Sequence, residues 1–142
     1  PDISTMTFLF TGDIEDAAMQ FILKNGALSQ NDIIKVPHHG SRSSLDADFL
    51  KRVFPRVAVF SAGKRNRYGH PHPRALAAYK GIGAAIYRTD QDGAVTVTVS
   101  PGGLNLKTFR ESRLHKVQLS RLFGGEEISN IQKVFETPPD PY

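Results

Sequence analysis

The feature that most constrains the fold is an alternation of short apolar runs with segments of helical character. The runs are rich in β-favouring residues and occupy residues 7–10, 33–36, 57–60 and 84–88. Apolar strands that alternate with helices indicate a layered α/β domain, in which the first strands are covered on both faces. The sequence therefore predicts one α/β core built around these four runs.

Three helices are predicted between the runs from their start and stop signals. The first places its apolar side chains on one stripe, at i, i+3, i+4, i+7 and i+8: Ile14, Ala17, Ala18, Phe21 and Ile22. Asn25 and Gly26 stop this helix. The second starts in the acidic segment 43–48 and ends at Pro55, and the third starts at Pro73.

The last third of the chain has a different pattern. Residues 89–93 have turn chemistry, and the alternating run at 95–99 is followed by a second turn and by residues 104–109, which predicts a hairpin. Past Phe109 the apolar spacing becomes nearly helical. We assign residues 1–110 to one domain and residues 111–142 to a helical tail or appendage.

Composition excludes several kinds of site. The chain has 142 residues and no cysteine, so any metal must be held by His, Asp or Glu. The net charge of +4 weakly favours an anionic partner, although a basic balance is also a common solubility device. No apolar run approaches the roughly 18 residues of a membrane helix, so we expect the chain itself to be soluble. Because it begins at Pro1 without a signal-peptide pattern, we expect it to be part of something longer.

Unusual polar loops follow the first three predicted strands. Asp13 follows the first strand, and His38-His39-Gly40-Ser41 follows the second. The loop after the third strand contains Asn66, Tyr68, His70 and His72. Sites in open α/β sheets form outside the carboxyl ends of strands, so these loops are expected to converge on one cleft. Carboxylate and imidazole groups there would suit Zn or Mn.

Each of these residues also has a purely structural interpretation. On spacing alone, Asp13 and His72 are favoured as caps of the helices that follow them. Residues 38–39 could be a turn histidine and a packed one, but no partners for two imidazoles are obvious there, which favours a functional role. The basic residues of segment 64–67 fit phosphate binding and a solvated loop equally well. Ser41 lacks the context of a nucleophile elbow, so covalent serine chemistry is not expected.

Four ordered strings resemble one known family. They are F-L-F-T-G-D-I-E, D-I-I-K-V-P-H-H-G-S-R-S-S, V-A-V-F-S-A-G-K-R-N-R-Y-G-H-P-H and Y-R-T-D-Q-D-G-A. Over about residues 5–110 they resemble the second half of the metallo-β-lactamase-fold domain of the ComEC competence proteins, membrane proteins through which bacteria internalise DNA. Choline-phosphate esterases outside the membrane share these motifs. The resemblance implies the second half of an αββα layered fold, with a mixed sheet and flanking helices.

The resemblance also implies a role for each polar loop. Asp13 would bridge two metal ions, and His38 would bind one of them. His39 and His70 would be catalytic residues that face the substrate and stabilise charge or protonate the leaving oxygen. Three further residues of these loops are expected to bind the substrate: Ser41, Asn66 and Tyr68. The fold's H-x-H-x-D-H motif, its third-motif histidine and its first-strand aspartate are absent from this chain, so we predict half of a site.

The resemblance implies two-metal hydrolysis of a phosphodiester. Two divalent ions, Zn or Mn, would act in the complete domain, and this chain alone need not hold either and is expected to be inactive. The expected partners are DNA, as the single strand that is degraded, and the rest of a membrane-bound parent protein that carries this domain on its extracytoplasmic face. A second copy of the chain is a further possible partner, bound through the surface that the missing half would cover. Two alternatives stay open: a soluble or secreted phosphodiesterase acting on a non-DNA phosphoester, and a metal-free module that docks DNA or a partner.

Overall fold

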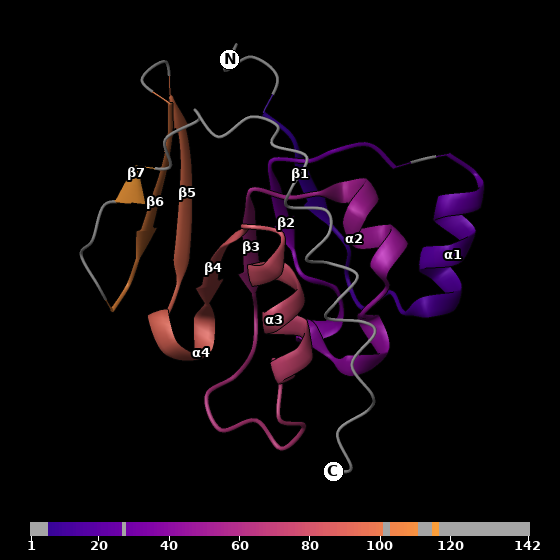
Figure 1. The fold of residues 1–142 in the computed structure, drawn as a ribbon. Helices are drawn as coiled ribbons and strands as arrows, with labels where there is room; N and C mark the ends of the chain where they lie inside the picture. Colours follow the sequence, from indigo (N-terminus) through magenta and orange to yellow (C-terminus); the bar gives the residue numbers. More distant parts are fainter. Residues whose placement is uncertain (1–5, 27, 101–102, 111–114, 117–142) are drawn as a thin grey trace.

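The chain forms two sheets and one layer of helices in the computed structural model, which describes residues 6–26, 28–100, 103–110 and 115–116 (Figure 1). The first sheet is parallel throughout, in the order of its strands along the chain: β1 (Phe8–Phe10), β2 (Ile33–Lys35), β3 (Val57–Phe60) and β4 (Ala85–Arg88). The second sheet is antiparallel: β5 (Val95–Ser100), β6 (Gly103–Thr108) and β7 (His115–Lys116). The parallel sheet lies between the helices and the second sheet.

Helices connect the parallel strands in succession and pack on one face of their sheet, and a last, short helix joins β4 to β5. The α-helices are α1 (Asp16–Lys24), α2 (Ala47–Val53), α3 (Pro73–Gly81) and the one-turn α4 (Thr89–Asp92). Two 3₁₀ turns follow β2: η2 (Pro37–Gly40) and η3 (Arg42–Ser44). The prediction of four strands and three longer helices is confirmed to within about two residues at each end. Residues 89–93, predicted as a turn, instead begin with α4.

Side chains at the starts of α2 and α3 explain where these helices begin. The carboxylate of Asp46 accepts a hydrogen bond from the backbone N–H of Phe49 at 2.7 Å. The Nδ1 of His72 accepts from the backbone N–H of Arg74 at 3.2 Å, which confirms the prediction that His72 caps a helix. Such caps satisfy N–H groups that have no partner inside the helix.

The main core lies between the helices and the parallel sheet. Its largest fully buried members include Met19 of α1, Ile34 of β2, Phe49 of α2 and Phe60 of β3. The ring of Phe60 packs edge-to-face on that of Tyr79 in α3, with centroids 5.4 Å apart. These contacts hold β2 and β3 against a close-packed core. The loops that contain His38, His39 and His70 follow these two strands.

The predicted apolar stripe of α1 is wrong in part. Phe21 is 68% exposed, whereas Met19, outside the predicted stripe, is fully buried. Ile22 and Leu23 pack beside Met19 against the core. The helix is therefore turned relative to the predicted stripe, because sequence spacing defines several overlapping stripes and tertiary packing selects one.

The second face of the parallel sheet packs on the hairpin. A smaller cluster joins the two sheets: Ile33, Val57, Tyr87, Leu104 and Leu106. The prediction that both faces are covered is thus confirmed for β2, β3 and β4. The expected mixed sheet is not found among the described residues, because α4 redirects the chain after β4 and the hairpin crosses the sheet face instead of pairing at its edge. The helices accordingly flank one face, and the specific αββα arrangement is not shown.

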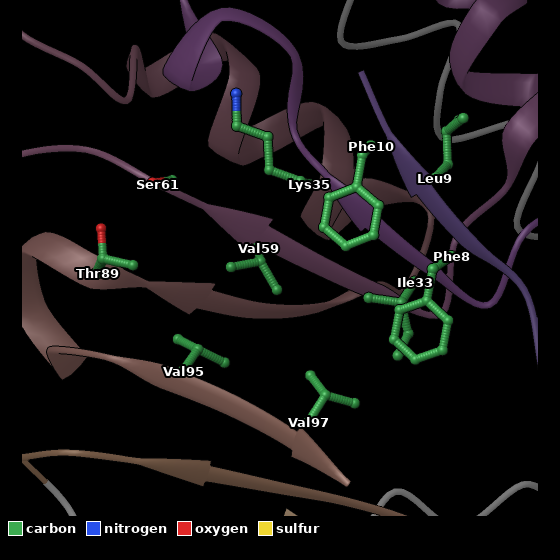
Figure 2. A pocket seen from close by; sticks show the side chains of 10 residues that line it. All are labelled: Phe8, Leu9, Phe10, Ile33, Lys35, Val59, Ser61, Thr89, Val95 and Val97. Carbon is green, nitrogen blue, oxygen red and sulfur yellow. The ribbon is translucent and has the colours of Figure 1, made fainter. Parts of the chain in front are cut away.

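An apolar pocket of about 440 Å³ opens between the two sheets beside β1. Figure 2 shows Phe8 and Phe10 of β1 pointing across it toward Val95 and Val97 of β5. Phe10 is 78% exposed and Phe8 is 40% exposed. At the other end the lining becomes polar, with Lys35, Ser61 and Thr89. The edge of the parallel sheet at β1 is thus less covered than its centre.

The predicted helical tail, residues 111–142, lies almost entirely outside the described residues. Within it, His115–Lys116 pairs with β6 as the short strand β7. The assignment of the remainder to a helical appendage stays a prediction. Of the helices in the described part of the chain, none combines the length and apolar character required to span a membrane.

Candidate functional site

The loops after β1, β2 and β3 meet at the carboxyl ends of their strands, as predicted. The ring centroids of His38 and His70 are 5.8 Å apart, and those of His39 and His70 are 6.5 Å apart. The Oδ1 of Asp13 lies 3.7 Å from the Nε2 of His39. Three sequence-distant segments therefore place one carboxylate and three imidazoles in one small region. Their individual chemical roles remain predictions.

The histidine loop has an unusual backbone. His38, His39 and Gly40 all have positive φ, at 43°, 58° and 78°. Non-glycine residues in that region cost free energy and persist where the surroundings hold them there. One such restraint is the backbone N–H of His38, which donates to the carbonyl oxygen of Gly12 at 3.1 Å and joins the first two loops.

His38 is held by a carboxylate that the sequence analysis did not identify. The Nδ1 of His38 lies 2.7 Å from the Oε1 of Glu15, and the hydroxyl of Ser43 donates to the same oxygen at 2.7 Å. This contact with His38 is close but is not a well-aligned hydrogen bond, because Nδ1 has no hydrogen-bond partner of good geometry among the described residues. The hydrogen bond from Ser43 and the close approach of His38 lower the pKa of Glu15.

Asp13 does not cap α1, so the interpretation favoured by spacing alone is wrong. The helix begins at Asp16, and Glu15 occupies the N-cap position without a capping side-chain hydrogen bond. Asp13 is 62% exposed, and its Oδ1 lies 3.7 Å from the Nζ of Lys35 as well as from His39. Lys35, whose role was also missed, donates to the carbonyl oxygen of Gly12 at 3.0 Å. The carboxylate of Asp13 is therefore available at the surface of the site.

His39 has one ring nitrogen fixed by the backbone. Its Nδ1 lies 2.5 Å from the carbonyl oxygen of Ser61. Because a carbonyl oxygen can only accept, Nδ1 carries the proton, and Nε2, which faces Asp13, holds the lone pair in the neutral ring. The loop after β3 thus orients a histidine that belongs to the loop after β2.

Asn66 organises its own loop. Its Nδ2 donates to the carbonyl oxygens of His70 at 2.6 Å and Gly63 at 2.9 Å, and its Oδ1 accepts from the backbone N–H of His70 at 2.9 Å. Both ends of the amide are occupied, so Asn66 holds His70 in place. Its expected contact with the substrate stays a prediction.

His70 lies between Tyr68 and the histidine pair. The Tyr68 ring stacks on it with centroids 5.8 Å apart and a tilt of 18°. The Nδ1 of His70 is buried without a hydrogen-bond partner among the described residues. Burial lowers the pKa of His70, and the charges of His38, His39 and His72 lower it further. Tyr68 is 65% exposed, and the guanidinium of Arg67 also lies over its ring.

Ser41 is only 4% exposed. Its Oγ lies 2.9 Å from the Oγ of Ser43, and its carbonyl oxygen accepts from the hydroxyl of Ser44 at 3.0 Å. These contacts fill the interior of the turn after η2. The residue faces inward in this structure, and its expected contact with the substrate stays a prediction.

A pocket of about 440 Å³ opens beside His39 and His70. Its lining also includes Asn66, Tyr68, Ser61 and Thr89, and the last two line the apolar pocket as well. The two hollows therefore meet at the ends of β3 and β4. A ligand in the histidine pocket would contact imidazole groups, an exposed aromatic ring and backbone.

The donors at this site fit part of a metal site. Asp13 and His38 provide the carboxylate and imidazole groups that suit Zn or Mn. No group of three or more metal-ligating side chains is present within the part of the chain that the structure describes. A catalytic zinc ion usually takes three protein ligands, so further ligands would have to come from residues outside this part.

Comparisons with known proteins give relatives that match 63–72% of this chain. "ComE operon protein 3" of Bacillus subtilis is 37% identical over 90 residues, which are 63% of this chain and 12% of that protein. "Competence protein ComA" of Neisseria gonorrhoeae is 31% identical over 103 residues, or 72% of this chain and 15% of that protein. "Recombination protein 2" of Haemophilus influenzae is 30% identical over 102 residues, or 72% of this chain and 13% of that protein. No protein-family model and no solved structure matches the chain.

The matched segments are short relative to these proteins. They span between 12% and 15% of the length of the three relatives. Over part of the chain, at 30–37% identity, the similarities indicate a competence-protein family.

Proposed function

We propose that this chain is the second half of a metal-dependent hydrolase domain, in which it helps to cleave DNA phosphodiester bonds during natural transformation. The convergence of Asp13, His38, His39 and His70 at the carboxyl ends of three parallel strands carries this proposal. The relative named "Competence protein ComA" supports the connection with natural transformation. The parent would be a membrane protein that holds this domain on its extracytoplasmic face.

Each residue has a proposed role that follows from its position in the site. Asp13 and His38 would hold divalent ions, Zn or Mn, together with ligands outside this chain. When bound, such ions lower the pKa of a water nucleophile and offset charge on the transferring phosphoryl group. The Nε2 of His39, oriented by the carbonyl of Ser61, points to the same region and can donate a proton to a phosphate or leaving oxygen once protonated.

The proposed substrate position is the pocket beside His39 and His70. Because the Nδ1 of His70 is buried, its Nε2 is the nitrogen that can reach a ligand. The guanidinium of Arg67 lies over the Tyr68 ring, 4.9 Å from its centre, and together they form an exposed surface against which a DNA base can stack. Single-stranded DNA fits these groups better than duplex DNA, because its bases are free to stack.

Metal removal tests the proposal. In a protein that contains the complete domain, chelation should abolish cleavage of single-stranded DNA, and adding Mn or Zn should restore it. Cleavage of a small phosphodiester but not of DNA would favour the non-DNA phosphodiesterase. If the protein binds DNA without metal and cleaves it with none of the added metals, the docking module is favoured and the proposal is contradicted.

The apolar pocket supports a second copy of the chain as a partner. We expect the isolated chain to self-associate through Phe8 and Phe10, because large exposed apolar patches favour association. Phe10→Lys should shift sedimentation toward the monomer. Phe21→Lys is the matched control, since Phe21 is another exposed phenylalanine that does not line this pocket. A monomer at all concentrations, or equal effects of the two variants, would refute this partner.

A further inference from the structure

Glu15 occupies a capping position but uses its side chain elsewhere. It lies at the N-cap of α1 and makes no side-chain cap hydrogen bond there. Its Oε1 is instead 2.7 Å from both the Nδ1 of His38 and the hydroxyl of Ser43. The contact thus joins the start of α1 to η2 and η3. The side chain of Glu15 is half-exposed, but its carboxylate is directed at the histidine loop and not at the free N–H groups of α1.

Because the Nδ1 of His38 is buried, its contact with Glu15 determines which nitrogen of the ring carries the proton. Nδ1 is shielded from solvent and has no well-aligned hydrogen-bond partner among the described residues, so Glu15 is the acceptor in position to satisfy it. Leaving a buried polar group unpaired is costly. An ionised carboxylate can only accept, so the proton in this contact belongs to Nδ1, and the lone pair of the neutral ring lies on Nε2.

We propose that Glu15, held in place by Ser43, is the positioning residue that fixes His38 as its Nδ1–H tautomer and leaves Nε2 free to bind an ion. The inference rests on the proposed function, in which His38 is a ligand. A carboxylate behind such a histidine fixes both the tautomer and the ring orientation. Its loss typically lowers metal affinity or activity about 10–100-fold, even though it does not touch the ion.

The first test observes the tautomer directly in the full chain, without metal or substrate. Long-range ¹H–¹⁵N correlation spectra at about pH 8, where an unperturbed histidine is neutral, distinguish a protonated Nδ1 from a protonated Nε2. The His38 signals are assigned by their loss in His38→Gln. We expect Nδ1–H in the wild type and a shift of the population toward Nε2–H in Glu15→Ala.

Three further variants sharpen this result. Glu15→Gln should preserve the Nδ1–H form, because the amide oxygen still accepts. Ser43→Ala should weaken the preference, since it frees the carboxylate, and it provides the test if Glu15→Ala does not fold. Asp48→Ala is the control: it removes an exposed carboxylate whose ion pair, 3.6 Å from Lys51, lies on α2. It should leave His38 unchanged.

Two outcomes would overturn the inference: a wild-type His38 protonated on Nε2, or a tautomer ratio that neither Glu15→Ala nor Ser43→Ala changes in a folded chain. The second readout is the metal concentration that half-activates hydrolysis by the complete domain, which Glu15→Ala should raise about 10–100-fold. Because the spectra require no ion, failure of the proposed hydrolase function would leave the tautomer result intact.

Discussion

Asp13→Ala should reduce metal-dependent hydrolysis by the complete domain by about 100-fold or more, because it removes a proposed metal ligand. The fold should tolerate the change. The carboxylate is 62% exposed, and its ion-pair contacts within the described residues, with Lys35 and His39, are both 3.7 Å long. Exposed ion pairs of this kind contribute about 0–1 kcal/mol to stability.

Two comparisons separate a ligand role from a general charge effect. Asp16→Ala removes a carboxylate three residues away, at the start of α1, and should change stability by a few tenths of a kcal/mol while leaving the rate unchanged. Asp13→Asn keeps the size but weakens a metal ligand, so it should resemble Asp13→Ala. The measurements are the DNA cleavage rate at saturating Mn and the urea midpoint of each variant. An unchanged rate in Asp13→Ala would remove Asp13 from the site.

Local chemistry in the sequence was sufficient to predict most secondary structure and the convergence of the loops. Val57–Phe60 is an apolar run with a sharp end, and Pro73 fits only the first turn of a helix, so both elements were located accurately. The loops converge because strands that pair in parallel end at the same edge of a sheet. This inference requires the direction of the strands but not their detailed packing.

The side-chain contacts and the burial of the site residues could not be predicted from the sequence, because both depend on tertiary packing. Glu15 and the carbonyl of Ser61 meet the two histidines from elements more than 20 residues away along the chain. The burial of Ser41 results from the two tight 3₁₀ turns on either side of it, which have no clear sequence signal. Glu15 was nevertheless visible in the string T-G-D-I-E, next to a residue already assigned to the site.

Gly40→Ala should be the most destabilising single-methyl change in the histidine loop. A Cβ at this position would lie 2.6 Å and 2.8 Å from two ring carbons of Phe60 and 3.0 Å from the Cβ of Pro71. Neither neighbour can move easily, because the Phe60 ring is fully buried and Pro71 is a rigid ring. We expect overpacking to cost about 1–3 kcal/mol, in addition to about 1–2 kcal/mol for a side chain at φ +78°.

Gly26→Ala separates these two costs. Gly26 has nearly the same φ, +67°, but an added Cβ would meet no atom of the described residues within 4 Å. The free energy of unfolding of Gly26→Ala, measured in urea, should therefore fall only by the conformational cost of about 1–2 kcal/mol. Gly40→Ala should also disturb the site, because the carbonyl oxygen of Gly40 accepts from the backbone N–H of His72 at 2.8 Å and so ties the histidine loop to the loop after β3. Equal losses of stability in the two variants would mean that the close approach of Phe60 to Gly40 does not constrain the loop.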